Sequence, residues 1–231
     1  MNDFIEEKHD DILCHIMHLS RGIERLEQLG EEITVEKGQE LNVIDQVPDC
    51  CYLVKTGRTI GCEITYSGEV RVYNLMEPNS MFLEGNLLLD APCPILFKAS
   101  MPSTLIRIDK CDLKRAFKRD IDVVLDVFES LAAKFLSSME MMRNDQQKPA
   151  GWRICELLLV FSNHYGKPYD GKILITEKIS HQMIADMLGM NRVTVSRILK
   201  DLRDLALVEQ INGHLCIRSV EAIKDHMDLI C

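Results

Sequence analysis

The sequence has no run of apolar residues long enough to cross a membrane, which takes about 18 to 20 of them. Its first residues, MNDFIEEKHDD, carry acids where a secretory signal has a basic and then an apolar segment. The nine cysteines include no Cys-X-X-Cys pair, which argues against a zinc site and against the disulfide framework of a secreted protein. We therefore expect a soluble globular protein that stays in the cytoplasm, has no membrane partner and keeps its thiols reduced.

The signatures of enzymes are missing as well. The sequence has no nucleophile elbow, phosphate-binding loop or kinase signature, and no histidine between His18 and His164. A metal-binding β-barrel enzyme or a haem-sensing roll usually needs imidazoles in such a segment. The cluster His9, Cys14, His15 and His18 could ligate a metal or a haem, but solvated residues on an acidic helix are favoured because no second cluster completes a site. The sequence thus predicts a protein that is not an enzyme and holds no metal.

Charge is distributed unevenly along the chain, whose formal net charge is −9. Residues 1–145 hold 16 Lys and Arg against 26 Asp and Glu, whereas residues 146–231 hold 11 against 10. The segment 192–203 has one acid, Asp201, and four basic residues, Arg192, Arg197, Lys200 and Arg203. The average charge argues against a protein that coats nucleic acid everywhere, but this segment predicts a local basic face.

The period of the apolar residues changes twice along the chain. Up to residue 30 it is helical, which predicts two amphipathic helices from Ile12, Ile16 and Leu19 and from Ile23, Leu26 and Leu29. Six runs of strand length then alternate with turn residues: ITVEKG, CYLVKTG, TIGCEITYSG, EVRVYNLMEPNS, PILFKAS and TLIRID. Many short strands at this spacing indicate a sandwich or a small roll, in which at least one of the adjacent Cys50 and Cys51 should belong to the core. A helical period returns near residue 120, so the fold class is α+β.

A heptad pattern runs through the long helix predicted after residue 120. Its positions are separated by alternating steps of four and three residues: Val124, Phe128, Leu131, Phe135, Ser138 and Met142. Such a stripe belongs either to a helix that lies on its own domain or to a two-stranded dimer contact. The dimer is favoured because the stripe is narrow and has charged flanks, and its contact residues would be Val124, Phe128, Leu131, Phe135 and Met142. The polar stretch NDQQKPAG that follows predicts a hinge.

The segment 181–200, HQMIADMLGMNRVTVSRILK, predicts a helix, a turn and a second helix. Two helices that cross steeply need a small residue at their contact and a residue that accepts positive φ at the turn, and Ala185 and Gly189 supply these. Ser180 and Asn191 are suitable N-caps for the two helices. A strand, GKILIT, precedes this segment, and LVEQINGHLCI after it predicts a β-hairpin that turns at its Asn-Gly pair. A hairpin in this place would be a wing.

If the second helix enters a major groove of DNA, its outward residues must reach base edges and phosphates. With the start of the first helix, the candidate DNA-binding residues are Ser180, His181, Gln182, Arg192, Val193, Thr194, Ser196, Arg197 and Lys200. The alternative is a helical hairpin with a solvated basic face. It is disfavoured because the small residue, the glycine, the cap and the apolar set coincide.

Together these segments resemble the family of the cyclic-AMP receptor protein and FNR, which are bacterial transcription regulators, over nearly the whole chain. The matching segments are EKGQEL, CYLVKTG and PNSMFLEGNLLL in the roll and RVTVSRIL in the recognition helix. The resemblance implies a cyclic-nucleotide-binding-like β-roll, a double-stranded jelly roll, with N-terminal helices over residues 1–111. A dimerisation helix over 112–146 and a winged helix-turn-helix over 147–231 would follow. It also implies a homodimer that works with RNA polymerase.

The resemblance places an effector pocket in the roll, formed by Leu83, Glu84, Gly85, Asn86, Cys93, Lys98 and Phe128. Cyclic-AMP-binding members hold the cyclic phosphate with an Arg-Ser pair where this chain has Cys93 and Pro94, which argues against cyclic AMP as effector. Cys14 is the only N-terminal cysteine, which argues against an FNR-type iron–sulfur cluster, and the lack of imidazoles in the roll argues against haem. Glu84 and Lys98 could bind a small anion together or could pair with each other. The cofactor or effector therefore stays unknown.

Two functions are open at this point. The first is a homodimeric, effector-controlled regulator that binds double-stranded DNA, and the second is a roll sensor or regulatory subunit whose C-terminal domain docks on a protein partner. The uneven charge and the wing favour the first. The family commonly has Glu where this chain has Val193, and Val cannot accept a hydrogen bond from cytosine but can pack on the methyl group of thymine. We therefore expect an inverted repeat with A·T pairs at the step that Val193 faces.

Overall fold

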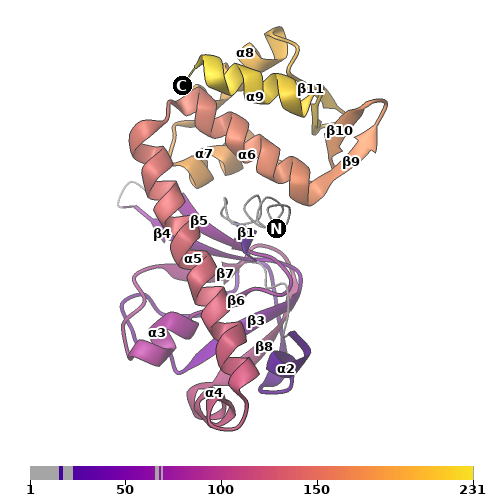
Figure 1. Ribbon diagram of the computed structural model, residues 1–231. Coiled ribbons are helices and arrows are strands. Elements are labelled where there is room, and N and C mark those ends of the chain that lie inside the picture. Colours follow the sequence, from indigo (N-terminus) through magenta and orange to yellow (C-terminus); the bar gives the residue numbers. More distant parts are fainter. Residues whose placement is uncertain (1–15, 18–22, 66–67, 69, 231) are drawn as a thin grey trace, which may run out of the picture. The chain divides into compact units, whose positions relative to one another are not determined.

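The structure is a computed structural model, and it describes residues 16–17, 23–65, 68 and 70–230 (Figure 1). The cluster of His9, Cys14, His15 and His18 therefore lies outside the described residues. By its contacts the chain divides into two compact units, one of His15–Ser138 and one that contains Met139–Cys231. This division falls inside a long helix, before the predicted hinge.

The first unit contains two four-stranded sheets. One has the order β1-β5-β4-β7, with strands Ile16–Met17, Val70–Met76, Thr59–Ile64 and Leu96–Ala99. The other has the order β2-β8-β3-β6, with strands Glu31–Val35, Ser103–Asp109, Cys50–Thr56 and Met81–Phe82. Each of the six predicted runs overlaps one strand. The helix predicted through Ile16 is wrong at that residue, because Ile16–Met17 pairs in parallel with β5 and this sheet pairing overrides the local helical spacing.

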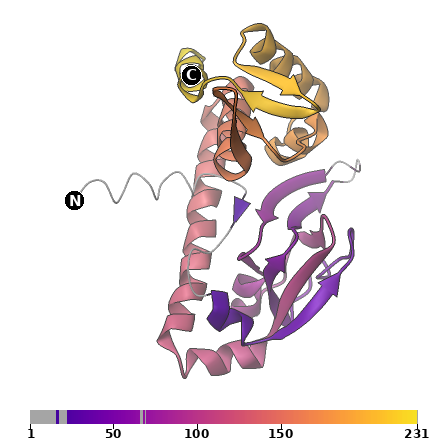
Figure 2. The ribbon, with the colours of Figure 1, turned by 90° about the vertical axis from the view of Figure 1, so that its right-hand side faces the viewer.

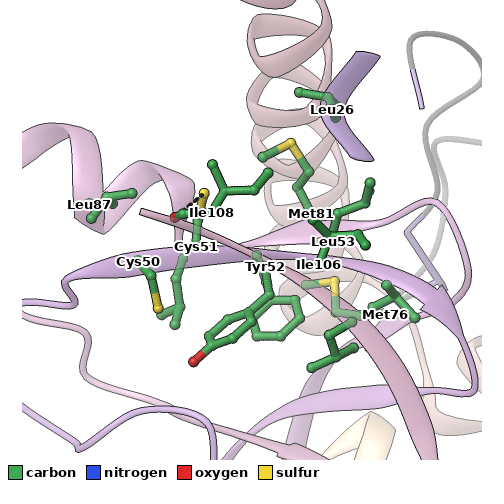
Figure 3. Close-up of a cluster of buried hydrophobic side chains, with 14 of the residues drawn as sticks. Leu26, Cys50, Cys51, Tyr52, Leu53, Met76, Met81, Leu87, Ile106 and Ile108 are labelled. Carbon is green, nitrogen blue, oxygen red and sulfur yellow. Dashed lines mark hydrogen bonds between the residues drawn. The ribbon is translucent and has the colours of Figure 1, made fainter. Parts of the chain in front are cut away.

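One apolar core, drawn in Figure 3, is shared by the strands of both sheets. Tyr52 of β3 stacks on Phe82 of β6 with ring centroids 5.1 Å apart, and Phe82 stacks on Phe97 of β7 at 4.9 Å. Cys50 and Cys51 are both buried, so both belong to the core. Burial raises the pKa of each thiol, which keeps them protonated and unreactive.

Four helices made of described residues belong to or start from this unit. They are α2 (Ile23–Glu27), α3 (Glu84–Leu89), α4 (Lys110–Phe117) and the 27-residue α5 (Ile121–Gln147). The single dimerisation helix predicted over 112–146 is therefore divided, because the chain turns at 118–120 and Asp120 Oδ1 accepts a hydrogen bond of 2.9 Å from the backbone N–H of Asp122. In the described part of the chain no helix is long and apolar enough to cross a membrane.

The second unit continues from the end of α5 with α6 (Ala150–Tyr165). Its later elements are β9 (Gly166–Tyr169), β10 (Lys172–Ile175), α7 (His181–Leu188), α8 (Arg192–Asp204), β11 (Val208–Ile211), β12 (His214–Ile217) and α9 (Val220–Leu229). The strands form an antiparallel sheet in the order β11-β12-β10-β9, and Figure 2 shows the hairpin of β11 and β12. The predicted hairpin turn is confirmed: Asn212 and Gly213 have φ of 51° and 85°, and a type I′ turn requires positive φ at both positions.

Candidate DNA-binding surface and effector pocket

The turn between α7 and α8 is built by short-range interactions. Gly189 ends α7 in the left-handed conformation, with φ 59° and ψ 41°, which side-chain-bearing residues rarely adopt. Ser180 Oγ accepts a hydrogen bond of 3.0 Å from the backbone N–H of Met183, and Asn191 Oδ1 accepts one of 2.8 Å from that of Val193. The predicted turn and both predicted caps are confirmed.

The recognition helix α8 has two opposite stripes. Val195, Leu199 and Leu202 are buried in the unit, whereas the exposed stripe consists of Val193, Arg197 and Lys200. Both stripes advance by steps of four and three residues, so each runs straight along the helix. Val193 is 75% exposed although it is apolar, and it therefore contributes nothing to the core of its own unit. The face that carries it is free to meet another molecule.

Ser196, one of the predicted DNA-binding residues, already has a hydrogen-bonding partner within the protein. Its hydroxyl lies 2.8 Å from Nδ1 of His181, at the start of α7, so the two side chains link the two helices. Burial, followed by the positive charges of Arg203 and Arg192, lowers the pKa of His181 and favours the neutral imidazole. Among the other candidates, Gln182 donates to Asp186 at 2.7 Å, Thr194 is half-buried and Arg192 is exposed.

The wing is fixed to the rest of its sheet by ion pairs. The carboxylate of Glu209 on β11 accepts hydrogen bonds from Lys172 of β10 at 2.7 Å and from Arg218, after β12, at 2.9 Å. These two partners, Lys172 first, lower the pKa of Glu209. The hairpin is thus held at both strands beside the helix-turn-helix.

In the roll, the predicted effector residues gather at the start of α3. Leu83 has φ 68°, a conformation that costs strain for a leucine and that suits the glycine usual at this place in the family that the sequence resembles. Glu84 is 1% exposed, and it accepts a hydrogen bond of 2.9 Å from Ser130 Oγ and another from Lys134 Nζ, both on α5. The cation that pairs with Glu84 is therefore Lys134, and not Lys98, whose pairing with Glu84 was one of the two alternatives left open by the sequence. Ser130 and Lys134 were not among the predicted pocket residues, although Val123, Val127, Ser130 and Lys134 follow one another at steps of four, three and four residues, which marks one face of a helix.

The other predicted pocket residues are placed as follows. Gly85 lies close to α5, since a Cβ added there would be 3.3 Å from Leu131 Cδ2. Asn86 donates to the backbone carbonyl of Pro92 at 2.9 Å, which brings the segment of the buried Cys93 toward α3. Lys98 lies on β7, half-exposed, and its backbone bridges Glu40.

The exposed apolar residues of α5 form a stripe that differs from the predicted one. This outer stripe advances by steps of four and three residues and consists of the exposed Ile121, Leu125, Phe128, Phe135, Met139 and Met142 together with the half-buried Ala132. Phe128, predicted both for the dimer contact and for the effector pocket, is 68% exposed and belongs to this stripe. Leu131, also predicted for the dimer contact, is partly buried against the core of the roll. Val124, also predicted there, is half-buried at the edge of the stripe.

Comparisons with known proteins agree with this organisation. The model of the cyclic nucleotide-binding domain matches residues 32–120, and that of the Crp-like helix-turn-helix domain matches residues 153–225. The global nitrogen regulator of Synechococcus elongatus is 26% identical over 175 residues, which cover 75% of this chain and 79% of the relative. The protein with the same name from Synechocystis sp. is 28% identical over 155 residues, which cover 66% of this chain and 69% of the relative.

Solved structures share the fold. A variant of CooA from Carboxydothermus hydrogenoformans has a TM-score of 0.77 at 18% identity, covering 91% of this chain and 96% of that one. CprK in complex with OCPA has a TM-score of 0.73 at 18% identity, covering 91% and 99% of the two chains. With both domain models matched in order and the recognition helix exposed, the chain belongs to the Crp/Fnr family of transcription regulators.

Proposed function

We propose that this protein is a homodimer that binds an inverted repeat in double-stranded DNA under the control of a small effector other than cyclic AMP. The observation that carries the proposal is the exposed stripe of α8, where Val193 stands beside Arg197 and Lys200 on a helix whose other side is buried. Two such helices in a symmetric dimer read two half-sites about one helical turn of DNA apart. RNA polymerase is the partner that the family implies, and the function involves no catalytic step.

A mobility-shift assay with random-sequence duplex at two salt concentrations tests this proposal. We expect selected sites and an affinity that falls steeply with salt, because the basic residues of α8 displace counterions from phosphates. Arg197→Ala should weaken binding, whereas Lys224→Ala, which removes an exposed lysine of α9, is the matched control. Binding without sequence selection or salt dependence would favour the alternative, in which this domain docks on a protein partner.

Val193 is expected to select A·T pairs at the step that it faces. Its methyl groups can pack on the C5-methyl of thymine, whereas a glutamate there would accept a hydrogen bond from N4 of cytosine. Val193→Glu should therefore shift that step toward G·C by roughly 1 to 3 kcal/mol. Selection from a random pool measures the shift, and Val193→Ala, whose smaller side chain should weaken the thymine preference without gaining G·C, is the control. Identical preferred sites for all three proteins would show that residue 193 does not face a base.

The proposed effector pocket is the region around Glu84, Ser130 and Lys134, next to the buried Cys93. We expect cyclic AMP to bind weakly or not at all, because Cys93 and Pro94 offer its phosphate no cation. Isothermal titration calorimetry with cyclic AMP measures this. A dissociation constant of about 1 μM or tighter would contradict the expectation and show that Lys134 or Lys98 has taken over the phosphate contact.

A further inference from the structure

The junction between α5 and α6 holds a pair of polar side chains that the function above does not use. Nδ2 of Asn144, near the end of α5, lies 3.1 Å from Oε1 and 3.0 Å from Oε2 of Glu156 on α6. Asn144 is 6% exposed. Both residues lie in the unit that contains Met139–Cys231, so the contact is internal to the unit that carries the helix-turn-helix.

One atom of this pair is left unsatisfied. Asn144 Oδ1 is buried and has no hydrogen-bond partner among the described residues. An ionised carboxylate can only accept hydrogen bonds, so ionised Glu156 cannot satisfy Oδ1. A protonated Glu156 could donate its O–H to Oδ1 while its other oxygen still accepts from Nδ2. An acid and a primary amide close a ring of two hydrogen bonds in this way, and a small rotation from the observed fork would form it.

The surroundings of Glu156 favour that proton. Burial raises the pKa of Glu156 most, the negative charge of Glu140 raises it further, and the pKa reaches about 7. The hydrogen bond from Asn144 and the charges of Arg143 and Arg153 act in the opposite direction. Among the described residues these are the charged groups that act on the carboxyl: Glu140 and Arg143 from α5, and Arg153 from α6. Arg143 forms an ion pair with Glu140, and Arg153 donates to the backbone carbonyl of Leu188 at 2.5 Å.

We propose that Asn144 and Glu156 form a proton-dependent latch, which fixes α6 to the end of α5 when Glu156 is protonated and loosens when it is ionised. Arg153 lies one turn before Glu156 and holds the last carbonyl of α7, so the latch reaches the helix-turn-helix through α6. The latch itself does not rest on DNA binding, and only its effect on DNA affinity rests on the proposed function.

The latch predicts how stability changes with pH. Between the ordinary value of a glutamate and a pKa of about 7, the folded state holds a proton that the unfolded chain has released. Stability therefore falls as pH rises through this window and is level above it. The experiment is thermal unfolding of the full chain between pH 5.5 and pH 8.5.

Glu156→Gln should keep the latch closed at every pH, because a glutamine amide makes the same two hydrogen bonds with Asn144. Its melting temperature should exceed that of the wild type at pH 8 by roughly 3 to 6 °C, and the gap should close toward pH 5.5. Glu140→Gln, which removes a neighbouring carboxylate without touching Asn144, should keep the fall of stability with pH but move it to lower pH, because the charge of Glu140 helps to raise the pKa of Glu156. A gap between Glu156→Gln and the wild type that does not change with pH would overturn the proposal.

A second pair of variants separates the effect of the latch on stability from the effect of burying a charge. In an Asn144→Ala background, Glu156→Gln should lose most of its gain at pH 8, because the amide then has no partner. A gain of equal size without Asn144 would overturn the latch.

For DNA binding, the affinities of Glu156→Gln and the wild type for one selected duplex should agree at pH 5.5 and differ at pH 8. Equal affinities at both pH values would overturn the link to the helix-turn-helix, whereas complete failure to bind DNA would refute the proposed function and leave the unfolding result valid.

Discussion

Phe135→Glu should convert the proposed dimer into a monomer. Phe135 is 65% exposed at the centre of the outer stripe, and a symmetric contact between two copies of α5 would bury it against its equivalent. A glutamate there would lose its water without gaining a cation. Analytical ultracentrifugation measures the state of assembly. Affinity for a duplex with two half-sites should fall by about 10² to 10⁴, because each monomer then binds alone.

The control for this prediction is Ser138→Glu, which places the same charge on the same helix beside the stripe. It should remain dimeric. Leu131→Glu would be a poor test, because Leu131 packs partly against the roll and its loss would damage the fold itself. A Phe135→Glu protein that stays dimeric and keeps full DNA affinity would contradict the assignment of the contact to α5.

Lys134→Met should destabilise the first unit by about 3 to 5 kcal/mol, because it leaves the carboxylate of Glu84 buried without its cation. For a chain of this size the melting temperature should fall by roughly 10 °C. Differential scanning calorimetry measures it. The double variant Glu84→Gln with Lys134→Met should recover most of the loss, since a neutral amide can still accept the hydrogen bond from Ser130.

Lys98→Met is the matched control, because Lys98 is the other cation of the predicted pocket and does not pair with Glu84. Its effect on stability should be small. If Lys98→Met costs as much as Lys134→Met, the assignment of the ion pair is wrong. The comparison therefore separates the pair observed in the structure from the Glu84–Lys98 pair that the sequence had left open.

The helix-turn-helix and its wing could be predicted from the sequence because their geometry is decided by near neighbours. Ser180 and Asn191 cap backbone N–H groups two or three residues ahead in the chain. Gly189 adopts a left-handed backbone conformation that is unfavourable for residues with a side chain. The Asn-Gly pair fixes the hairpin for the same reason. The six long strands followed from the alternation of apolar runs and turn residues. The two-residue strands β1 and β6 did not, because two residues carry no period.

The face of α5 that turns inward was decided only by the tertiary structure. Its apolar residues fit two overlapping heptad patterns, which share Phe128, Phe135 and Met142. The packing of Val123 and Val127 against the roll selects the pattern that leaves Leu125 outside and draws Leu131 toward the core. The spacing of residues along a helix defines its stripes, but the neighbour that covers one of them lies elsewhere in the chain.

The buried polar pairs could not be predicted from the sequence either. Glu84 meets Lys134 across 50 residues, and Asn144 meets Glu156 across a change of helix direction, so no local pattern joins the partners. A charge or an amide buried at such a place is tolerated only where the fold supplies a partner, and the partner is known only once the helices are packed. The sequence alone thus determined the helix-turn-helix with its wing, most of the strands and the family resemblance. The packing of α5 and α6 decided which groups surround the effector pocket and which carboxyl is placed to respond to pH.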